Sequence, residues 1–204
     1  LNFAKQAADS GVKRFIFISS IKVNGEGTLV GNKYTENDCP LPDDSYGISK
    51  YEAEKQLQLL ACNTNMEIVI IRPPLVYGEG VKGNFSNLLK LANTGLPLPF
   101  GAIDNQRSMV YLGNLTDFII KCIDCPKLAN EVFLISDGED LSIAGLIGYL
   151  RLAMIRPVRL IPVPKWIFSF VGKITGKPEV VHRLCGSLQI DASKASECLG
   201  WVPP

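Results

Sequence analysis

Several features that would point to particular functions are missing from these 204 residues. The formal net charge is only +1, so the overall charge gives no electrostatic case for binding nucleic acid or a membrane surface. No run of about 18 apolar residues occurs, so no membrane-spanning helix is expected. The apolar and aromatic stretch 165–171 is too short to cross a bilayer, and we expect it to pack in the core rather than against lipid.

The cysteines and the single histidine offer little for metal or disulfide chemistry. The cysteine spacings show no disulfide framework and no secretory leader is visible, so we expect reduced thiols and a cytoplasmic location. Cys122 and Cys125 form a lone Cys-x-x-Cys with no second pair at zinc spacing, so no metal site is expected. His182 lies outside the motifs described below, and we expect it to be a surface or structural residue.

What is present is an ordinary globular composition, with 47% hydrophobic and 20% charged residues. The length of 204 residues is enough for one well-buried domain with a small second lobe. Apolar runs predict strands at 13–19, 66–72, 108–112, 131–136, 158–163 and 188–191. Helical patterns predict helices at 1–10, 45–62, 84–94, 114–124, 142–154, 165–174 and 192–199. We expect an α/β fold with a parallel sheet whose first strand is buried on both faces, and a turn at 75–80.

A pattern with chemical meaning opens the helix at 45–62. Tyr46 and Lys50 are four residues apart, which places both side chains on one helix face. A phenol titrates near pH 10, and a fixed ammonium beside it lowers that pKa, so Tyr-x-x-x-Lys can act as a proton-transfer unit. The same spacing also occurs on ordinary solvated helix faces. The preceding strand favours the functional interpretation, because it ends in Ser19 and Ser20 and can deliver Ser20 towards the pair.

At this point the sequence resembles the extended short-chain dehydrogenase/reductase family, in its nucleotide-sugar epimerase/dehydratase branch. Five segments match the family's motifs in the family's order, and together they cover nearly the whole chain. They are Phe17–Ser20 with Val23–Gly25, Tyr46–Lys50, Ile71–Gly78, Arg107–Leu115, and Asp191–Lys194 with Leu199–Trp201.

One family motif is absent. The dinucleotide fingerprint Gly-x-x-Gly-x-x-Gly does not occur, and in the family it lies N-terminal to the segments above. The chain also opens at Leu1 in what looks like the middle of a helix, so we expect a fragment or processed chain. Taken alone, it should bind NAD poorly and have an uncovered sheet edge.

The resemblance implies the C-terminal portion of a Rossmann-like, doubly wound parallel sheet plus a small α/β substrate-binding lobe. Residues 1–80 would form the second half of the NAD-binding domain. Residues 81–204 would mainly form the nucleotide-sugar-binding lobe, with elements that return to the main sheet. The implied cofactor is NAD, without a distinction from NADP. The implied partners are a nucleotide-diphosphate sugar and a second copy, since many relatives dimerise through the Tyr/Lys helix and its neighbour.

The function implied is that of a 4-epimerase acting on a UDP-hexose or UDP-N-acetylhexosamine. Tyr46 would be the base, Lys50 would hold the nicotinamide ribose, and Ser20 would bond the sugar oxygen. Ser20 is followed by Ile21-Lys22 rather than Asp-Glu, which argues against dehydratase chemistry. Leu75 stands where some epimerases have a nucleotide-contacting Asn. The alternatives are a reductase of 4-keto nucleotide sugars that uses NAD(P)H, and a non-catalytic binding protein built on this fold.

The resemblance also assigns the remaining binding residues. Ser19 and Pro73 would join Tyr46 and Lys50 around the cofactor. Four residues would meet the substrate, namely Asn84, Phe85, Arg107 and Tyr77, with Arg107 at the diphosphate because guanidinium suits phosphate geometry. Each has a structural alternative: an ion pair for Arg107, helix packing for Phe85 and a core position for Tyr77. Arg183 is a weaker phosphate candidate, for which we expect a solvated role.

Overall fold

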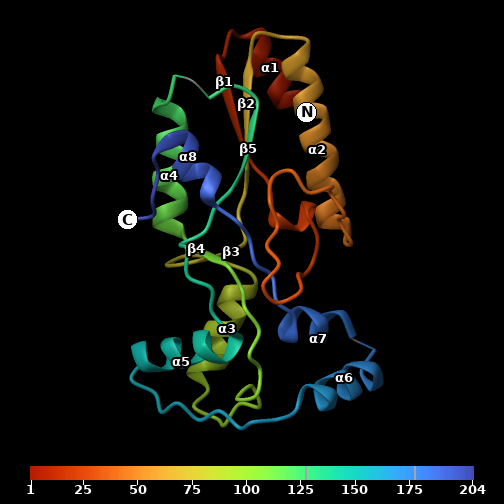
Figure 1. The fold of residues 1–204 in the computed structure, drawn as a ribbon, viewed down its shortest axis with the longest axis vertical. Coiled ribbons are helices and arrows are strands. Elements are labelled where there is room, and N and C mark those ends of the chain that lie inside the picture. Colours follow the sequence, from red (N-terminus) through yellow and green to blue (C-terminus); the bar gives the residue numbers. More distant parts are fainter. Residues whose placement is uncertain (127, 177) are drawn as a thin grey trace.

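The computed structural model describes residues 1–126, 128–176 and 178–204, with every side chain in them except that of Asn84. Its centre is a three-stranded parallel sheet in the order β1 (Arg14–Ile18), β2 (Glu67–Arg72), β5 (Glu131–Leu134). Helices α1 (Asn2–Asp9) and α2 (Ser45–Cys62) cover one face, and α4 (Leu112–Asp124) and α8 (Ser193–Leu199) cover the other (Figure 1). The α/β class and the parallel sheet are as the sequence predicts.

The strands alternate their side chains between the two helical layers. In β2, Ile68 and Ile70 belong to the core cluster on the α1/α2 side, while Val69 and Ile71 belong to the cluster that includes Phe118 of α4. This period of two follows from the pleat of a strand. Because each buried position of the central strand meets one layer or the other, β2 is an uninterrupted apolar run from Ile68 to Ile71.

The expectation for the first strand is wrong in one respect. All five residues of β1 are partly buried, whereas those of β2 from Ile68 to Arg72 are fully buried. The reason is its position: β1 pairs only with β2, in register from Arg14 opposite Glu67 to Ile18 opposite Ile71, and forms one edge of the sheet. An edge strand leaves one side of its backbone without a neighbour.

A second, two-stranded parallel sheet joins β3 (Leu75–Tyr77) to β4 (Met109–Tyr111). The first half of the predicted turn at 75–80 is therefore a strand. The following helix, α4, starts at Leu112 rather than at Asn114. Asn114 lies in the first turn of α4, and its side chain donates to Asp137 Oδ1 at 2.8 Å.

The remaining helices form a lobe below the main sheet (Figure 1). They are α3 (Asn84–Asn93), α5 (Ile143–Ala153), α6 (Lys165–Ile174) and α7 (Pro178–Cys185). Their shared core contains Leu98, Phe100, Ile103 and Ile147. Helix α7 was not predicted. The segments 158–163 and 188–191 make only isolated bridges in place of the predicted strands, and Pro162 interrupts the first of them because proline cannot donate to a ladder.

A buried arginine ties this lobe together. The guanidinium of Arg151 in α5 is fully buried and donates to the carbonyl oxygens of Ala92, Leu96 and Arg159, with a longer contact to Pro157. These oxygens come from the end of α3, the loop after it and the linker after α5. The charge is therefore satisfied by backbone dipoles rather than by a carboxylate. Among the helices described, none combines the length and apolar character that crossing a bilayer requires.

Candidate active site

The carboxyl end of β1 delivers two serines to the edge where parallel sheets bind ligands. Ser19 N–H still donates to Ile71 O at 2.7 Å, and Ser19 is only 3% exposed. Its hydroxyl oxygen is buried and has no hydrogen-bond partner among the described groups. Ser20 is extended and opens the short helix η1 (Ile21–Val23), where its Oγ accepts from Lys22 N–H at 3.3 Å.

The start of α2 lies against η1. Asp44 caps the helix by accepting from Gly47 N–H at 2.7 Å. A Cβ on Gly47 would come within 2.8 Å of Lys22 O, closer than real contacts allow. The glycine of Tyr46-Gly47 is therefore required for the first turn of α2 to approach the segment that follows Ser20.

Lys50 connects the helix to the strand end. Its Nζ donates to Ile18 O at 2.9 Å and lies 5.7 Å from the ring centroid of Tyr46. Burial lowers the pKa of the Lys50 ammonium from its ordinary value, and the carboxylate of Glu54 opposes that shift. Tyr46 itself is 50% exposed. Within the described part, no hydrogen bond joins Tyr46 to Ser20, so the structure brings their segments together without a direct link.

Ion pairs among four charged side chains connect η1 and the start of α2 to helix α7 of the lower lobe. Lys22 Nζ bonds Glu26 Oε1 at 2.8 Å and also Asp44, while Arg183 of α7 bonds Glu26 Oε2 at 2.9 Å and reaches Asp44 at 3.3 Å. Burial alone would raise the pKa of Asp44, but the bonds from Lys22 and Gly47 and the nearby charges hold that pKa below its usual value. Arg183 thus has carboxylate partners rather than the solvated role expected for it.

A buried network behind the site was not predicted. Arg72 at the end of β2 makes two bonds to the Glu54 carboxylate, at 3.0 and 2.6 Å, and a third to Asn24 Oδ1 at 3.0 Å. All three side chains are buried. Glu54 is four residues beyond Lys50, and Asn24 follows η1, so the network holds α2, β2 and the Ser20 segment in one arrangement.

The predicted substrate residues occupy different settings. Tyr77 donates to Asp137 Oδ2 at 2.8 Å, and its ring packs on Phe85 with centroids 5.9 Å apart. Burial, with help from Asp137, raises the pKa of Tyr77 to about 12, so its hydroxyl stays protonated. Phe85 is buried, so only its backbone could face a ligand. The side chain of Asn84 lies outside the described residues.

Arg107 is held in place by backbone. Its Nη1 donates to Arg183 O at 2.8 Å and to Gly186 O at 2.9 Å, at the end of α7. Burial lowers the pKa of this guanidinium, and the negative charge of Glu26 opposes that shift. An arginine stays charged at neutral pH even so. Nη1 is committed to carbonyl oxygens, which leaves Nη2 and Nε as the donors that a phosphate could meet.

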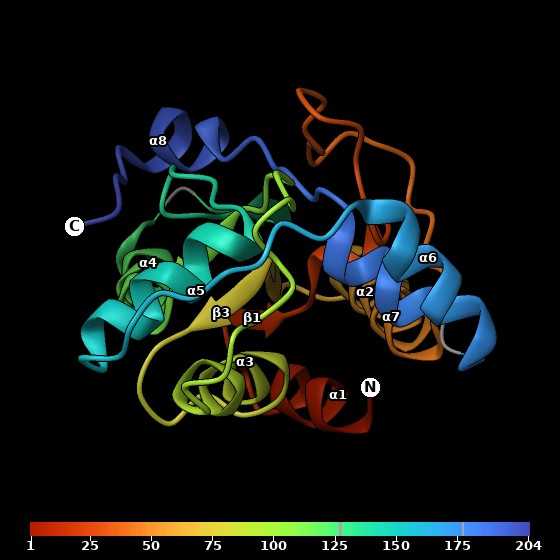
Figure 2. The same ribbon diagram turned by 90° about the horizontal axis from the view of Figure 1, so that it is seen from below.

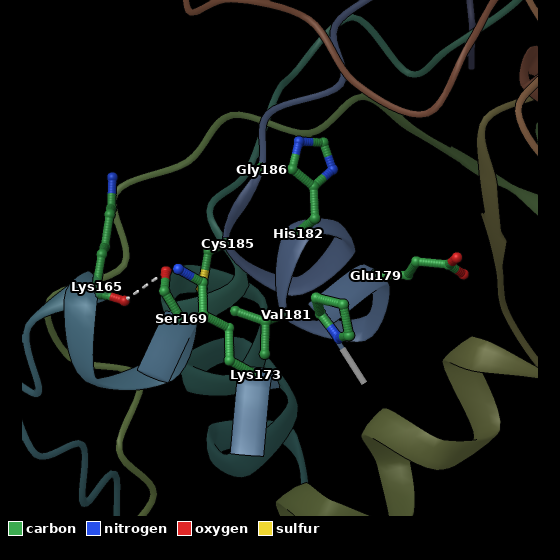
Figure 3. A pocket seen from close by; sticks show the side chains of 9 residues that line it. Lys165, Ser169, Lys173, Glu179, Val181, His182, Cys185 and Gly186 are labelled. Atoms are coloured by element: carbon green, nitrogen blue, oxygen red, sulfur yellow. Dashed lines mark hydrogen bonds between the residues drawn. The ribbon is translucent and has the colours of Figure 1, made fainter. Parts of the chain in front are cut away.

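Two hollows lie outside the Ser20, Tyr46 and Lys50 segments. One, of about 580 Å³, lies between α6 and α7, and Figure 3 shows the side chains of both helices that line it, His182 and Cys185 among them. The other, of about 620 Å³, lies within the loop 24–41. Neither includes a residue of the predicted catalytic set.

The sequence matches a known protein family over most of its length. A model described as the NAD dependent epimerase/dehydratase family matches residues 1–136. The chain belongs to this family. The membership that the resemblance implied is thereby confirmed.

Its relatives include epimerases whose names give different groups attached to the sugar. A UDP-glucose 4-epimerase of Vibrio cholerae is 57% identical over 205 residues, which is all of this chain and 62% of that protein. An N-acetyl-alpha-D-glucosaminyl-diphospho-ditrans,octacis-undecaprenol 4-epimerase of Escherichia coli O157:H7 is 32% identical, over 96% of this chain and 62% of its own length. The chain thus spans less than two thirds of both relatives.

Solved structures of this family share the fold. The UDP-glucose 4-epimerase of Thermotoga maritima, solved with UDP-glucose, aligns with a TM-score of 0.71 at 25% identity, over 98% of this chain and 61% of its own. The UDP-N-acetylglucosamine 4-epimerase of Bacillus cereus aligns with a TM-score of 0.78 at 19% identity, over all of this chain and 63% of its own.

The residues at the strand ends fit the NAD that gives the family its name. The buried Ser19 hydroxyl needs a partner, because an unsatisfied buried polar group is costly. The Lys50 ammonium has three donors, one of which is used by Ile18 O. Pro73, at the end of β2, is buried and accepts from Ile21 N–H at 3.0 Å, which keeps the two strand ends together. This donor set suits the hydroxyl groups of a ribose.

The first cysteine of the Cys-x-x-Cys pair lies in the hydrophobic core. Cys122 is a buried member of the core, and burial raises the pKa of its thiol to about 12. A thiol held in this way is a poor nucleophile. Within the described residues, no group of three or more His, Cys, Asp or Glu side chains could hold a metal ion.

Proposed function

We propose that the protein carrying this chain is an NAD-dependent 4-epimerase of a nucleotide sugar, a UDP-hexose or UDP-N-acetylhexosamine. The observation that carries the proposal is the Lys50 bond to Ile18 O, which sets the Tyr46/Lys50 pair at the end of the Ser19-Ser20 strand. The Vibrio cholerae relative, at 57% identity, supports the substrate class.

The residues have complementary roles in the proposed reaction. Tyr46 takes the proton from the sugar 4-hydroxyl as the C4–H bond breaks, and it returns the proton when the 4-keto sugar is reduced on its other face. Ser20 donates to the same oxygen, and Lys50 holds its positive charge beside the Tyr46 ring. NAD, when bound, supplies the acceptor and then the donor of the hydride. No atom is gained or lost overall.

The binding residues belong to the proposal as well. Ser19, Lys50 and Pro73 hold the cofactor at the strand ends. Arg107 meets the diphosphate through Nη2, and the backbone amides of Asn84 and Phe85 face it from the start of α3. Tyr77 lines the site with its ring, since its hydroxyl is bonded to Asp137. Residues 1–80 and 81–204 remain the proposed division into a cofactor half and a substrate lobe.

A second candidate differs in the carrier of the sugar. The Escherichia coli relative is named for a substrate with a polyprenyl diphosphate, and the exposed apolar side chains of α6 described below favour a carrier of that kind. The reacting sugar and the roles of Tyr46, Lys50 and Ser20 would be unchanged.

The test uses the complete protein with no added coenzyme. UDP-glucose, UDP-N-acetylglucosamine and a polyprenyl-diphospho-N-acetylglucosamine are supplied separately, and the C4 epimers are measured by chromatography and NMR. Equilibration of a UDP-sugar supports the first proposal, and equilibration of only the lipid-linked sugar supports the second. Consumption of added NADPH with a 4-keto sugar, without epimer formation, would replace both with a reductase.

We also propose a homodimer formed through α1 and α2, in the cytoplasm. The two helices pack on the same face of the sheet (Figure 1), and each carries exposed apolar side chains, Phe3 in α1 and Ile48 and Leu59 in α2. Sedimentation of the complete protein tests it, because Phe3→Ser with Leu59→Ser should convert dimer to monomer.

A further inference from the structure

The net charge of +1 hides an uneven distribution. Between Asp140 and Glu179 the sequence has no acidic residue, while it contains basic residues throughout. Arg151 is buried in the lobe, but Arg156, Arg159, Lys165 and Lys173 are exposed. Lys165 has one carboxylate partner, the exposed Asp104. This end of the molecule is therefore basic although the chain as a whole is nearly neutral.

The same end exposes large apolar side chains. On α6, Trp166, Phe170 and Ile174 are 69%, 60% and 69% exposed and recur every four residues, so they share one face. The opposite face packs inward, where Phe168 stacks on Phe100 with centroids 6.0 Å apart and Gly172 is buried. The expectation that stretch 165–171 packs in the core is wrong for Trp166 and Phe170.

The linker between α5 and α6 continues this surface. Leu152, Ile155, Val158 and Ile161 are all exposed, and Ile155 is 94% exposed with a φ of 55°. A β-branched residue is rarely found in this left-handed region, where glycine is favoured. Figure 1 shows α5, the linker and α6 along one end of the molecule, and Figure 2 shows them in front when that end faces the viewer.

The chemistry of this surface selects its partner. Apolar and aromatic side chains interspersed with lysine and arginine characterise segments that lie in the interface of an anionic bilayer, with tryptophan at headgroup level. A second copy fits poorly, because it would bring two basic ends together. A ten-residue α6 could lie in such an interface without crossing it.

We propose that the α5–α6 end docks peripherally on an anionic lipid bilayer. Trp166, Phe170, Ile174 and Ile155 enter the headgroup region, and Arg156, Arg159 and Lys173 lie against lipid phosphates. This docking does not depend on the proposed epimerase reaction. The docking does affect how a substrate in the membrane would reach the candidate active site. Helix α7 packs on α6, and its Arg183 bonds Asp44 at the start of α2. The candidate active site would lie one helix away from the bilayer.

The experiment is cosedimentation of the complete protein with vesicles. Phosphatidylcholine vesicles are compared with vesicles that also contain phosphatidylglycerol, at low and high salt. The expected result is binding that is about tenfold stronger to the anionic vesicles and that weakens with salt. Arg156→Gln with Arg159→Gln should weaken it about fivefold for each charge removed. Trp166→Ser with Phe170→Ser should abolish it.

A matched control removes apolar side chains elsewhere. Leu29 and Val30 are 77% and 71% exposed in the loop 24–41, and Leu29→Ser with Val30→Ser should leave vesicle binding unchanged. All these positions are exposed, so thermal unfolding should be little altered in every variant. A variant that melts like the parent but no longer sediments identifies the surface itself.

Tryptophan fluorescence gives a second readout. Trp201 is 5% exposed and donates to Asp117 at 2.7 Å, so Trp166 dominates any change on binding. Adding anionic vesicles should shift its emission to the blue and protect it from acrylamide, and Trp166→Phe should remove the shift.

Three results would overturn the proposal. The first is equal sedimentation with neutral and anionic vesicles. The second is Trp166 emission that is already blue and protected without vesicles, which would mean that other parts of the same protein cover the surface. The third is dissociation of a dimer by Trp166→Ser with Phe170→Ser, which would assign the surface to a second copy.

Discussion

Helix α2 carries the Tyr-x-x-x-Lys spacing twice, at Tyr46/Lys50 and again at Tyr51/Lys55. The ammonium is closer to the ring in the second pair, at 4.8 Å from the centroid compared with 5.7 Å in the first. The two pairs differ in the hydrogen-bond partner of the lysine. Lys50 donates to the strand end at Ile18 O, whereas Lys55 donates to exposed Glu52 on its own helix. The spacing alone does not distinguish the two pairs, whereas the bond from Lys50 to the strand end does.

The largest expected difference between the pairs is in turnover. Tyr46→Phe removes the proposed base and should lower kcat by roughly 10²–10⁴-fold, while Tyr51→Phe should change it less than about twofold. Epimer formation by the complete protein measures both, and circular dichroism checks that each remains folded. Equal losses in the two variants would remove Tyr46 from the mechanism.

The carboxylates behind the pairs should differ in stability. Glu54→Gln leaves the buried Arg72 without a negative partner and should cost about 3 kcal/mol of unfolding free energy. Glu52→Gln removes only an exposed bond and should cost less than about 0.5 kcal/mol. Urea unfolding measures the two values. A small cost at Glu54 would show that the network does not hold α2 in place.

The lysines should differ in activity by a smaller factor. Lys50→Met removes the ammonium between Tyr46 and Ile18 O and should lower kcat about 10²-fold, with the alkaline side of the pH profile altered. Lys55→Met keeps its helix and should leave both kcat and the pH profile unchanged. A pH profile that is the same in parent and Lys50→Met would limit Lys50 to binding.

The smallest expected effect is on stability and concerns Asp44, the N-cap of α2 next to the Tyr46/Lys50 pair. The folded pKa of Asp44 is held below its usual value, so its stabilisation is present above about pH 4 and is lost as pH falls through the lower folded pKa. Asp44→Asn keeps a capping oxygen but removes the negative charge that pairs with Lys22 and Arg183, so it should cost about 1 kcal/mol at neutral pH and progressively less in acid. The adjacent, exposed Asp43→Asn is the control, and a pH-independent cost would contradict the assignment.

The elements around the site could be predicted because their signals are local. The bounds of α2 follow from the Asp44 cap and from its helical pattern, and the Ser142 cap likewise marks the start of α5. Helix α7 also carried local signals that were overlooked: Pro178 at its first position and Glu179 in its first turn. The predicted strand 158–163 fails because Pro162 removes a donor that a ladder needs.

The contacts that complete the site could not be predicted from local signals. Arg72 meets Glu54 and Asn24 only because a helix, a strand and a loop converge in three dimensions. Asp137 likewise gathers bonds from Tyr77, Asn114 and the backbone of Tyr111. The exposure of Trp166 and Phe170 is also a property of the assembled lobe, since an apolar helix pattern does not tell which face finds a neighbour.

The buried guanidinium of Arg151 has a consequence for cooperativity. Its bonds reach the end of α3, the following loop and the linker beyond α5, and a guanidinium keeps its charge at any ordinary pH. If one of these segments opens, a buried cation loses acceptors while it remains out of water, which is strongly unfavourable. The segments should therefore open together, and amide hydrogens in 88–98 and 147–160 should exchange with one shared opening free energy.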